Sequence, residues 1–148
     1  MRVSTRSEFD VVNGLLDRAL ALDPDYAYAK ALKVRAHVMA TGARAMTHDE
    51  GRAALQMAYD LLDGRQSDPL VLAFAGHMVA YLGNDHELGY RSILTAKQMN
   101  RNSVIVCVSA AWVAAYMGRY DDAIAHAQWA YRLNPLDPNL GHCRAAHG

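Results

Sequence analysis

The sequence predicts an all-α protein, an α-α superhelix of about three helical hairpins. Segments with apolar residues at helical spacing close in a similar way at Asp23-Pro24, at Asp68-Pro69 and at Asn134-Pro135. Asn100 and Asn134 recur at a spacing of about 34 residues, and self-similarity at this period is typical of stacked helical hairpins. Strand-like alternation of apolar and polar residues is absent, so a generic helical bundle is the alternative.

Composition and charge narrow the class of protein. The 148 residues fit one domain, and an apolar share of 52% is enough to build a core. With 15 basic and 15 acidic residues and no run of Lys and Arg, we expect no direct contact with nucleic acid. No apolar stretch reaches the roughly 18 to 20 residues that span a bilayer, and we find no signal-peptide segment. Cys107 and Cys143 do not form a disulfide framework, which favours a cytoplasmic location.

The first expected element is one helix within residues 7–25, a half repeat. Its apolar residues, Phe9, Val12, Leu16 and Ala19, follow helical spacing up to Pro24. Just before it, residues 5–8 match the capping box, in which a hydroxyl and a glutamate satisfy free N–H groups.

The second unit, residues 26–68, is a divergent hairpin with helices expected over 26–42 and 50–62. Thr47 and Glu50 form a second capping-box pattern. The neighbouring His48-Asp49-Glu50 resembles a catalytic cluster, but acids in a first helical turn stabilise the helix dipole. We therefore assign these residues to the helix start.

Two clearer hairpins follow, over residues 69–103 and 104–137. Asp68 caps the first of them, with Pro69 at the first helical position. Ser103 is expected to cap the next helix. Residues 104–108 are mostly β-branched, but their place in the period predicts a helix rather than a strand. That helix is expected to end at Gly118, about one period after Gly83, before a turn through residues 119–121.

The last complete unit resembles a tetratricopeptide repeat. Small residues allow the close crossing of two helices, and the matching positions are Ala111, Gly118, Tyr120, Ala123, Ala130 and Pro135. Cys107 and Ala114 depart from the family, which usually has Trp and Tyr there. The preceding unit matches more weakly, at Gly76, Gly83, Gly89 and Ala96, with Arg101 in place of the closing Pro.

A narrower resemblance concerns the segments ALALDPDYAYAKAL, DPLVLAFAGHMVAYLG and YRLNPLDPN. They are similar to the C-terminal repeat region of bacterial adenylate or guanylate cyclases and of winged-helix transcriptional regulators. The resemblance implies a sensory or scaffolding part, without the effector's activity. The half repeat at 7–25 and the start of a further helix at 138–148 lead us to expect a fragment of a longer signalling protein.

Catalytic motifs are missing from the sequence. It contains no nucleophile elbow, Walker-type loop or His-Glu-x-x-His pattern, and we expect neither an enzyme nor a cofactor. His142, Cys143 and His147 form a metal-like group that would need His126 as a fourth ligand. We expect a polar chain end there rather than a metal site.

In tetratricopeptide arrays the first helix of each hairpin lines the concave face, and we expect this face to bind a partner. Trp, Tyr and Arg anchor interfaces because they bury much area at low entropy cost, although packing between helices also uses aromatic residues. Arg35 alone adds a positive charge, so recognition of an acidic tail is not expected. The register assigns to this face Tyr28, Arg35, Met39, Leu70, Ala73, His77, Tyr81, Ile105, Val108, Trp112 and Tyr116.

The sequence therefore predicts a non-catalytic interaction or scaffolding module that binds a protein or peptide, including an effector domain of its own chain. One alternative is a structural linker or dimerisation unit, since exposed apolar end faces would favour self-association. The other is an enzyme with a pocket between hairpins, which would need His77 and a facing carboxylate.

Overall fold

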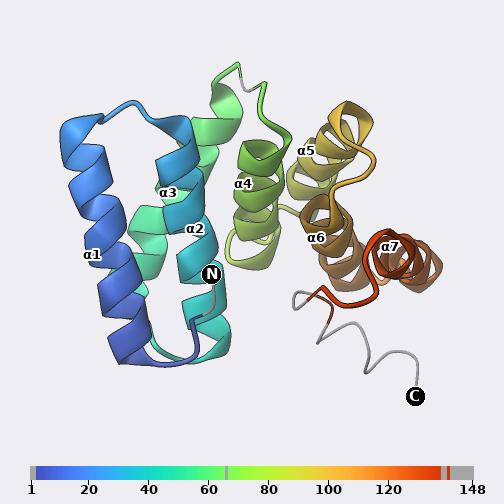
Figure 1. The fold of residues 1–148 in the computed structure, drawn as a ribbon, viewed down its shortest axis with the longest axis horizontal. Helices are drawn as coiled ribbons and strands as arrows, with labels where there is room; N and C mark the ends of the chain where they lie inside the picture. The colour runs from blue at the N-terminus through green and yellow to red at the C-terminus, as the bar shows by residue number, and fades with distance from the viewer. Residues whose placement is uncertain (1–2, 66, 138–139, 141–148) are drawn as a thin grey trace.

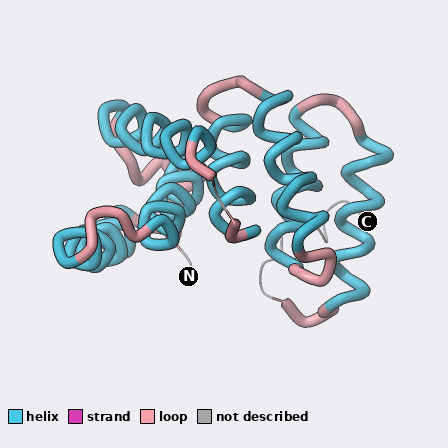
Figure 2. The backbone as a smooth tube through the Cα atoms, turned by 90° about the horizontal axis from the view of Figure 1, so that it is seen from above, coloured by secondary structure: helices cyan, strands magenta, loops and turns pink. Residues whose placement is uncertain are grey.

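The computed structural model describes residues 3–65, 67–137 and 140. This part of the chain consists of seven α-helices and contains no strand, as Figure 1 shows. The predicted all-α class is therefore confirmed, and short loops join the helices in Figure 2. The helices are α1 (Arg6–Leu22), α2 (Ala27–Gly42), α3 (His48–Asp63), α4 (Pro69–Tyr81), α5 (His86–Met99), α6 (Val104–Tyr116) and α7 (Tyr120–Leu133).

Side-chain caps fix most of the helix starts. Both predicted capping boxes form, at Thr5 for α1 and at Thr47 for α3. The predicted caps of α4 and α6 also form, where Asp68 accepts from the Leu70 N–H and Ser103 accepts from the Val106 N–H. Each cap satisfies a backbone donor that has no partner inside its helix. The β-branched segment 104–108 is helical, as its place in the period predicts.

The turn before α7 lies about two residues earlier in the chain than expected. Helix α6 ends at Tyr116, Gly118 has a φ of 71°, and α7 already begins at Tyr120. Residues 120 and 121 therefore belong to the helix rather than to the turn. A positive φ costs glycine little, and this lets the chain reverse between Tyr116 and Tyr120. Asp121 and Asp122 then lie in the first turn of α7, where acidic side chains stabilise the helix dipole.

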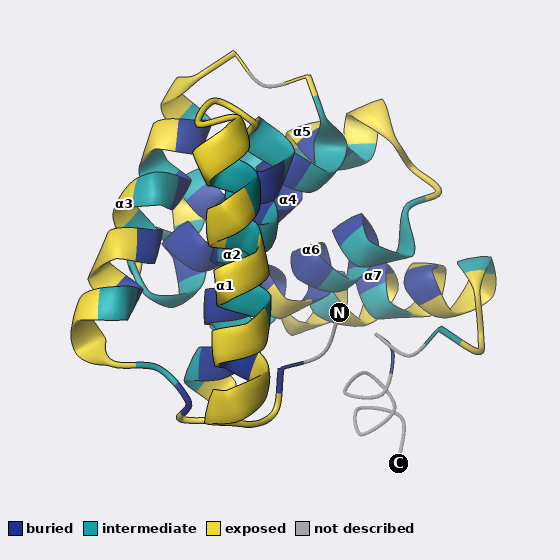
Figure 3. Ribbon diagram, turned by 60° about the vertical axis from the view of Figure 1, so that its left-hand side comes forward, coloured by how far each residue is buried: buried dark blue, intermediate teal, exposed yellow. Residues whose placement is uncertain are grey.

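Helices α2, α4 and α6 pack side by side in chain order, and each is the first helix of a hairpin. The second helices α3 and α5 each pack on the first helix of their own hairpin and on that of the next one. Helix α4 is enclosed by α2, α3, α5 and α6, and its surface in Figure 3 is almost entirely buried. Two clusters of buried side chains form the core, one around α2, α3 and α4 and one around α4, α5 and α6.

The period of the sequence reappears as a period of burial. Val71, Val106 and Leu140 follow one another at intervals of about one period, and all three are buried. Ala96 and Ala130, again one period apart, are also both buried. Leu140 packs in a cluster with Ala130, so the chain after α7 keeps the packing position that Val106 has in the preceding hairpin.

The helices α4 and α5 cross at two glycines. A Cβ atom on Gly89 would lie 2.5 Å from the Gly76 carbonyl oxygen and 2.7 Å from the Ala80 Cβ. A Cβ on Gly76 would lie 2.8 Å from the Gly89 carbonyl oxygen. Because backbone atoms face both glycines, no side-chain movement can make room there. The crossing therefore requires glycine at both positions.

This crossing predicts opposite effects of two Gly→Ala changes. Gly89→Ala forces α4 and α5 apart, and should lower the free energy of unfolding by about 1–3 kcal/mol. Gly14→Ala is the matched control on the exposed side of α1, where a Cβ meets no atom within 4 Å. It should raise the free energy of unfolding by roughly 0.5–1 kcal/mol, because alanine loses less entropy in a helix. Urea unfolding of both variants measures the difference, and a neutral Gly89→Ala would contradict the crossing.

Candidate functional site

Four of the predicted partner-binding residues meet at the seam between α4 and α6. His77 and Tyr81 lie one turn apart on α4, and Trp112 and Tyr116 lie one turn apart on α6. The Tyr81 and Tyr116 rings are stacked, with centroids 5.5 Å apart and an interplanar angle of 24°. The Trp112 and Tyr116 centroids are 6.1 Å apart. We call these four residues the aromatic cluster.

Tyr116 is the centre of the aromatic cluster. Its hydroxyl shares a hydrogen bond of 3.1 Å with Nε2 of His77. The ring of His86, at the start of α5, lies 6.5 Å from the Tyr116 ring, a contact that the repeat register did not predict. Pairs of aromatic rings at these distances stabilise one another beyond the effect of buried area. The cluster is therefore held in one arrangement by contacts from three helices.

Burial sets the protonation of the cluster. Desolvation and then the positive charge of Arg35 lower the pKa of His77 to about 4. Desolvation, followed by the neighbouring Tyr81, raises the pKa of Tyr116. Both groups are therefore neutral at pH 7, and the cluster presents uncharged rings with polar edges. Trp112 retains 37% of its surface exposed, which makes it the accessible member.

Arg35 extends the cluster toward α2. Its guanidinium carbon lies 4.8 Å from the centre of the Phe74 ring, a cation–π distance. Burial lowers the pKa of Arg35, and Tyr28 and Asp137 oppose this effect with smaller contributions. Asp137, from the segment after α7, thus lies close enough to Arg35 to act on its charge. The sequence did not predict this approach.

The remaining residues of the predicted face have mainly packing roles. Leu70 and Ile105 pack against the core cluster around α2, α3 and α4, and Val108 packs against the cluster that contains Leu140. Ala73 is fully buried. Met39 packs beside Phe9 of α1, and Tyr28 lies near Tyr26 with ring centroids 6.4 Å apart. The structure thus brings together the α4–α6 half of the predicted face and Arg35.

A second polar cluster, missed from the sequence, joins α5 and α7. Nζ of Lys97 donates to Nδ1 of His126 over 2.8 Å, which leaves Nε2 of the neutral ring to donate to the Tyr90 hydroxyl over 3.1 Å. Desolvation and then Lys97 lower the pKa of His126 to about 4. The guanidinium carbon of Arg119 lies 5.0 Å from the centre of the Tyr90 ring. These contacts satisfy polar groups between two helices.

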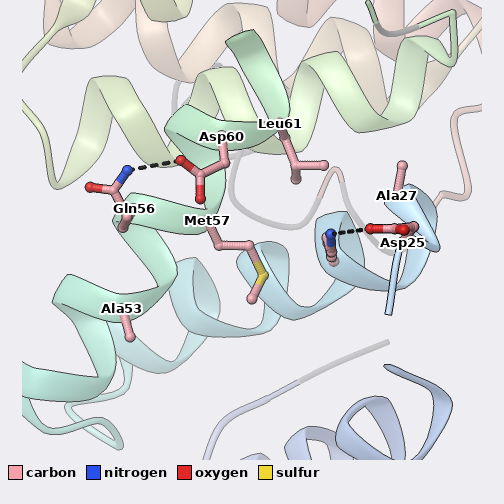
Figure 4. Close-up of a pocket in the computed structure, with 8 residues that line it drawn as sticks. Asp25, Ala27, Ala53, Gln56, Met57, Asp60 and Leu61 are labelled. Atoms are coloured by element: carbon pink, nitrogen blue, oxygen red, sulfur yellow. Dashed lines mark hydrogen bonds and ion pairs between the residues drawn. The ribbon is translucent and has the colours of Figure 1, made fainter. Parts of the chain in front are cut away.

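An open hollow of about 320 Å³ lies between α2 and α3 (Figure 4). Met57 and Leu61 form its apolar side. Its polar side chains already interact, since Gln56 donates to Asp60 over 2.9 Å and Lys30 pairs with Asp25 at 3.7 Å. Its size is at the lower limit of small-molecule sites. It offers no convergent polar groups, so the aromatic cluster is the better candidate.

Metal ligation finds no support in the described part of the chain, where no group of three or more His, Cys, Asp or Glu residues has suitable geometry. The metal-like residues His142, Cys143 and His147 lie outside the described residues, as does the helix expected over 138–148 apart from Leu140. The described helices also include none that is long and apolar enough to cross a membrane.

Comparison with known proteins identifies no family for the chain. A scan against protein-family models gave no match, and a search of curated proteins gave none either. A functional assignment therefore depends on the residues and contacts of this chain.

Two histidines with strongly lowered pKa values, the half-buried His77 and the buried His126, predict an acid-sensitive fold. Their pKa values of about 4 lie below the ordinary 6.5, so the unfolded chain binds more protons between these limits. Stability should be complete above pH 6.5 and should fall as the pH decreases to 4, by up to about 1.4 kcal/mol per pH unit for each histidine. Urea unfolding at several pH values measures this slope.

Single variants separate the contributions of the two histidines. His77→Phe and His126→Gln each remove one titrating group, so each should reduce the slope between pH 6.5 and 4. The ion pair of Glu50 with Arg6 overlaps only the lower end of this window, because its contribution is lost between the ordinary pKa of Glu50, 4.5, and its lowered value of about 2, and neither variant changes that pair. A slope that neither variant changes would show that the histidines are not buried as described.

Proposed function

We propose that this chain is a non-catalytic module that binds a protein or peptide segment on the aromatic cluster. The observation that carries this proposal is the convergence of His77, Tyr81, Trp112 and Tyr116 from two neighbouring first helices, with Trp112 partly exposed. Interface hot spots are enriched in Trp, Tyr and Arg, and all three types are present here. The ordered rings also lose little conformational entropy when a partner binds.

The charge state of the cluster favours binding over acid–base catalysis. A general base works best with a pKa near the operating pH, and the pKa of His77 is about 4. The identified causes of that shift are burial and Arg35, rather than a carboxylate of the kind that the alternative enzyme function requires. The neutral rings and the half-buried guanidinium of Arg35 suit a segment with apolar or aromatic side chains and a polar backbone.

The wider setting is part of the same proposal. The repeated hairpins and the order of their contacts support a tetratricopeptide-like array, and the resemblance to repeat regions of bacterial signalling proteins supports a regulatory role in the cytoplasm. An effector domain of the same longer chain is then a natural partner. Self-association is the second candidate, because apolar side chains on α1 and α7 are exposed.

The two tryptophans provide a matched test. Trp112 in the aromatic cluster is 37% exposed, and Trp129 on α7 is 40% exposed and donates to the Arg101 carbonyl. Peptides selected from a random library on the wild-type chain should bind Trp112→Ala about 2 kcal/mol more weakly. Trp129→Ala should leave their affinity unchanged. Fluorescence-polarisation titrations measure both.

Thermal melts of the same variants show whether a loss of affinity results from unfolding of the variant. Because Trp112 is partly exposed, its loss should cost less than the roughly 3–5 kcal/mol typical of a fully buried Trp. The proposal fails if Trp112→Ala keeps full affinity, or if both Trp variants weaken binding equally.

A further inference from the structure

Helix α7 carries an apolar stripe on its outward side. Tyr120, Ile124 and Tyr131 are 67%, 44% and 46% exposed, and Ala127 lies between them. Spacings of four, three and four residues place these side chains along one side of the helix. We call these four residues the α7 stripe. Helix α7 lies at the edge of the described part of the molecule in Figure 1.

Comparison with the equivalent positions of α5, one repeat earlier, indicates that the α7 stripe resembles a helix-packing face. Tyr90 and Ile93 of α5 lie one period of the repeat before Ile124 and Ala127, and both are buried in the core cluster that contains α6. On α7 the position that corresponds to Tyr90 is thus exposed, at Ile124, and the one that corresponds to Ile93 is half-buried, at Ala127. A second helix fits such a face better than an irregular segment does.

The order of side chains in the α7 stripe is symmetric about its midpoint, between residues 125 and 126. When two copies of α7 lie antiparallel across this midpoint, Tyr120 is opposite Tyr131 of the partner and Ile124 is opposite Ala127. A large side chain then meets a small one at the centre, and aromatic pairs lie at both ends. Self-complementarity of this kind is what a two-fold interface requires.

Charge supports the same arrangement. Asp121 in the first turn and Arg132 in the last turn lie on the same flank of the stripe. Neither takes part in an ion pair within the described chain, whereas Arg119 pairs with Asp122 at 2.7 Å. An antiparallel partner brings its own Arg132 beside Asp121, and the two-fold axis produces this pair twice. The helix dipoles of the two copies also oppose each other favourably.

Helix α1 does not meet these conditions. Val11, Leu15 and Leu22 form its exposed apolar stripe, but Arg18 lies within that stripe. An antiparallel copy of α1 would place two Arg18 side chains within about one turn of each other at the centre, and like charges repel there. The outward face of α1 is therefore less suited to self-pairing than that of α7.

We propose that two copies of this chain associate through an antiparallel pair of α7 helices, centred on Ile124 and Ala127. The surface is about three helical turns long, which places it at the low end of interface sizes, below about 1,200 Å² in total. A reversible dimer with a dissociation constant in the micromolar range or weaker is expected. The proposal is independent of the aromatic cluster, which lies on α4 and α6.

Sedimentation equilibrium across the micromolar range tests the dimer. The wild-type chain should change from monomer to dimer and form nothing larger. Ile124→Glu should weaken association by tenfold or more, because it places two carboxylates at the centre of the pair. Leu15→Glu, the matched control on α1, should leave the dissociation constant unchanged.

A charge exchange tests the antiparallel orientation. Asp121→Arg alone and Arg132→Asp alone should each weaken the dimer, and the double variant should recover much of the loss. Circular dichroism confirms that each variant is folded. The proposal is overturned by a monomer at all concentrations, by open-ended growth beyond the dimer, by a Leu15→Glu effect as large as that of Ile124→Glu, or by no recovery in the double variant.

Discussion

The enclosure of α4 by four other helices is the constraint on which the rest of the structure depends. The helix contains no charged residue, and its buried positions cover all sides. Such a helix is stable only in the middle of an array, because any side without a neighbouring helix would expose apolar surface to water. The neighbouring helices must therefore approach closely, and the paired glycines at the α4–α5 crossing permit this.

The candidate site follows from that enclosure. His77 and Tyr81 bear the titratable groups of α4, and a buried polar group is costly unless it finds a hydrogen-bond partner. The Tyr116 hydroxyl provides that partner for His77 across the seam with α6. The same contact that satisfies His77 collects four aromatic side chains in one place. The aromatic cluster therefore both completes the core and offers a surface.

Local signals in the sequence predicted much of the helical framework. Caps such as Thr5 and Thr47 act within the first helical turn, and the period of the repeat relates buried positions such as Val71 and Val106. The meeting of His77 with Tyr116 also followed from the register. Contacts that depend on the sideways offset of helices could not be derived, among them Arg35 over Phe74 and the link from Lys97 through His126 to Tyr90. The repeat period of the sequence does not define how far one helix is shifted along its neighbour. Which partners the long side chains of Arg35 and Lys97 contact depends on that shift.

The order of contacts along the array has a consequence for how the chain opens. Helix α1 packs mainly on α2 and α7 mainly on α6, whereas α4 has a neighbour on every side. In a linear array each unit is stabilised by its neighbours, so opening begins at the ends and moves inward. Backbone amides of α1 and α7 should then exchange hydrogen first, and those of α4 only upon global unfolding. The molecule would keep a protected centre at the aromatic cluster while its outer helices fluctuate.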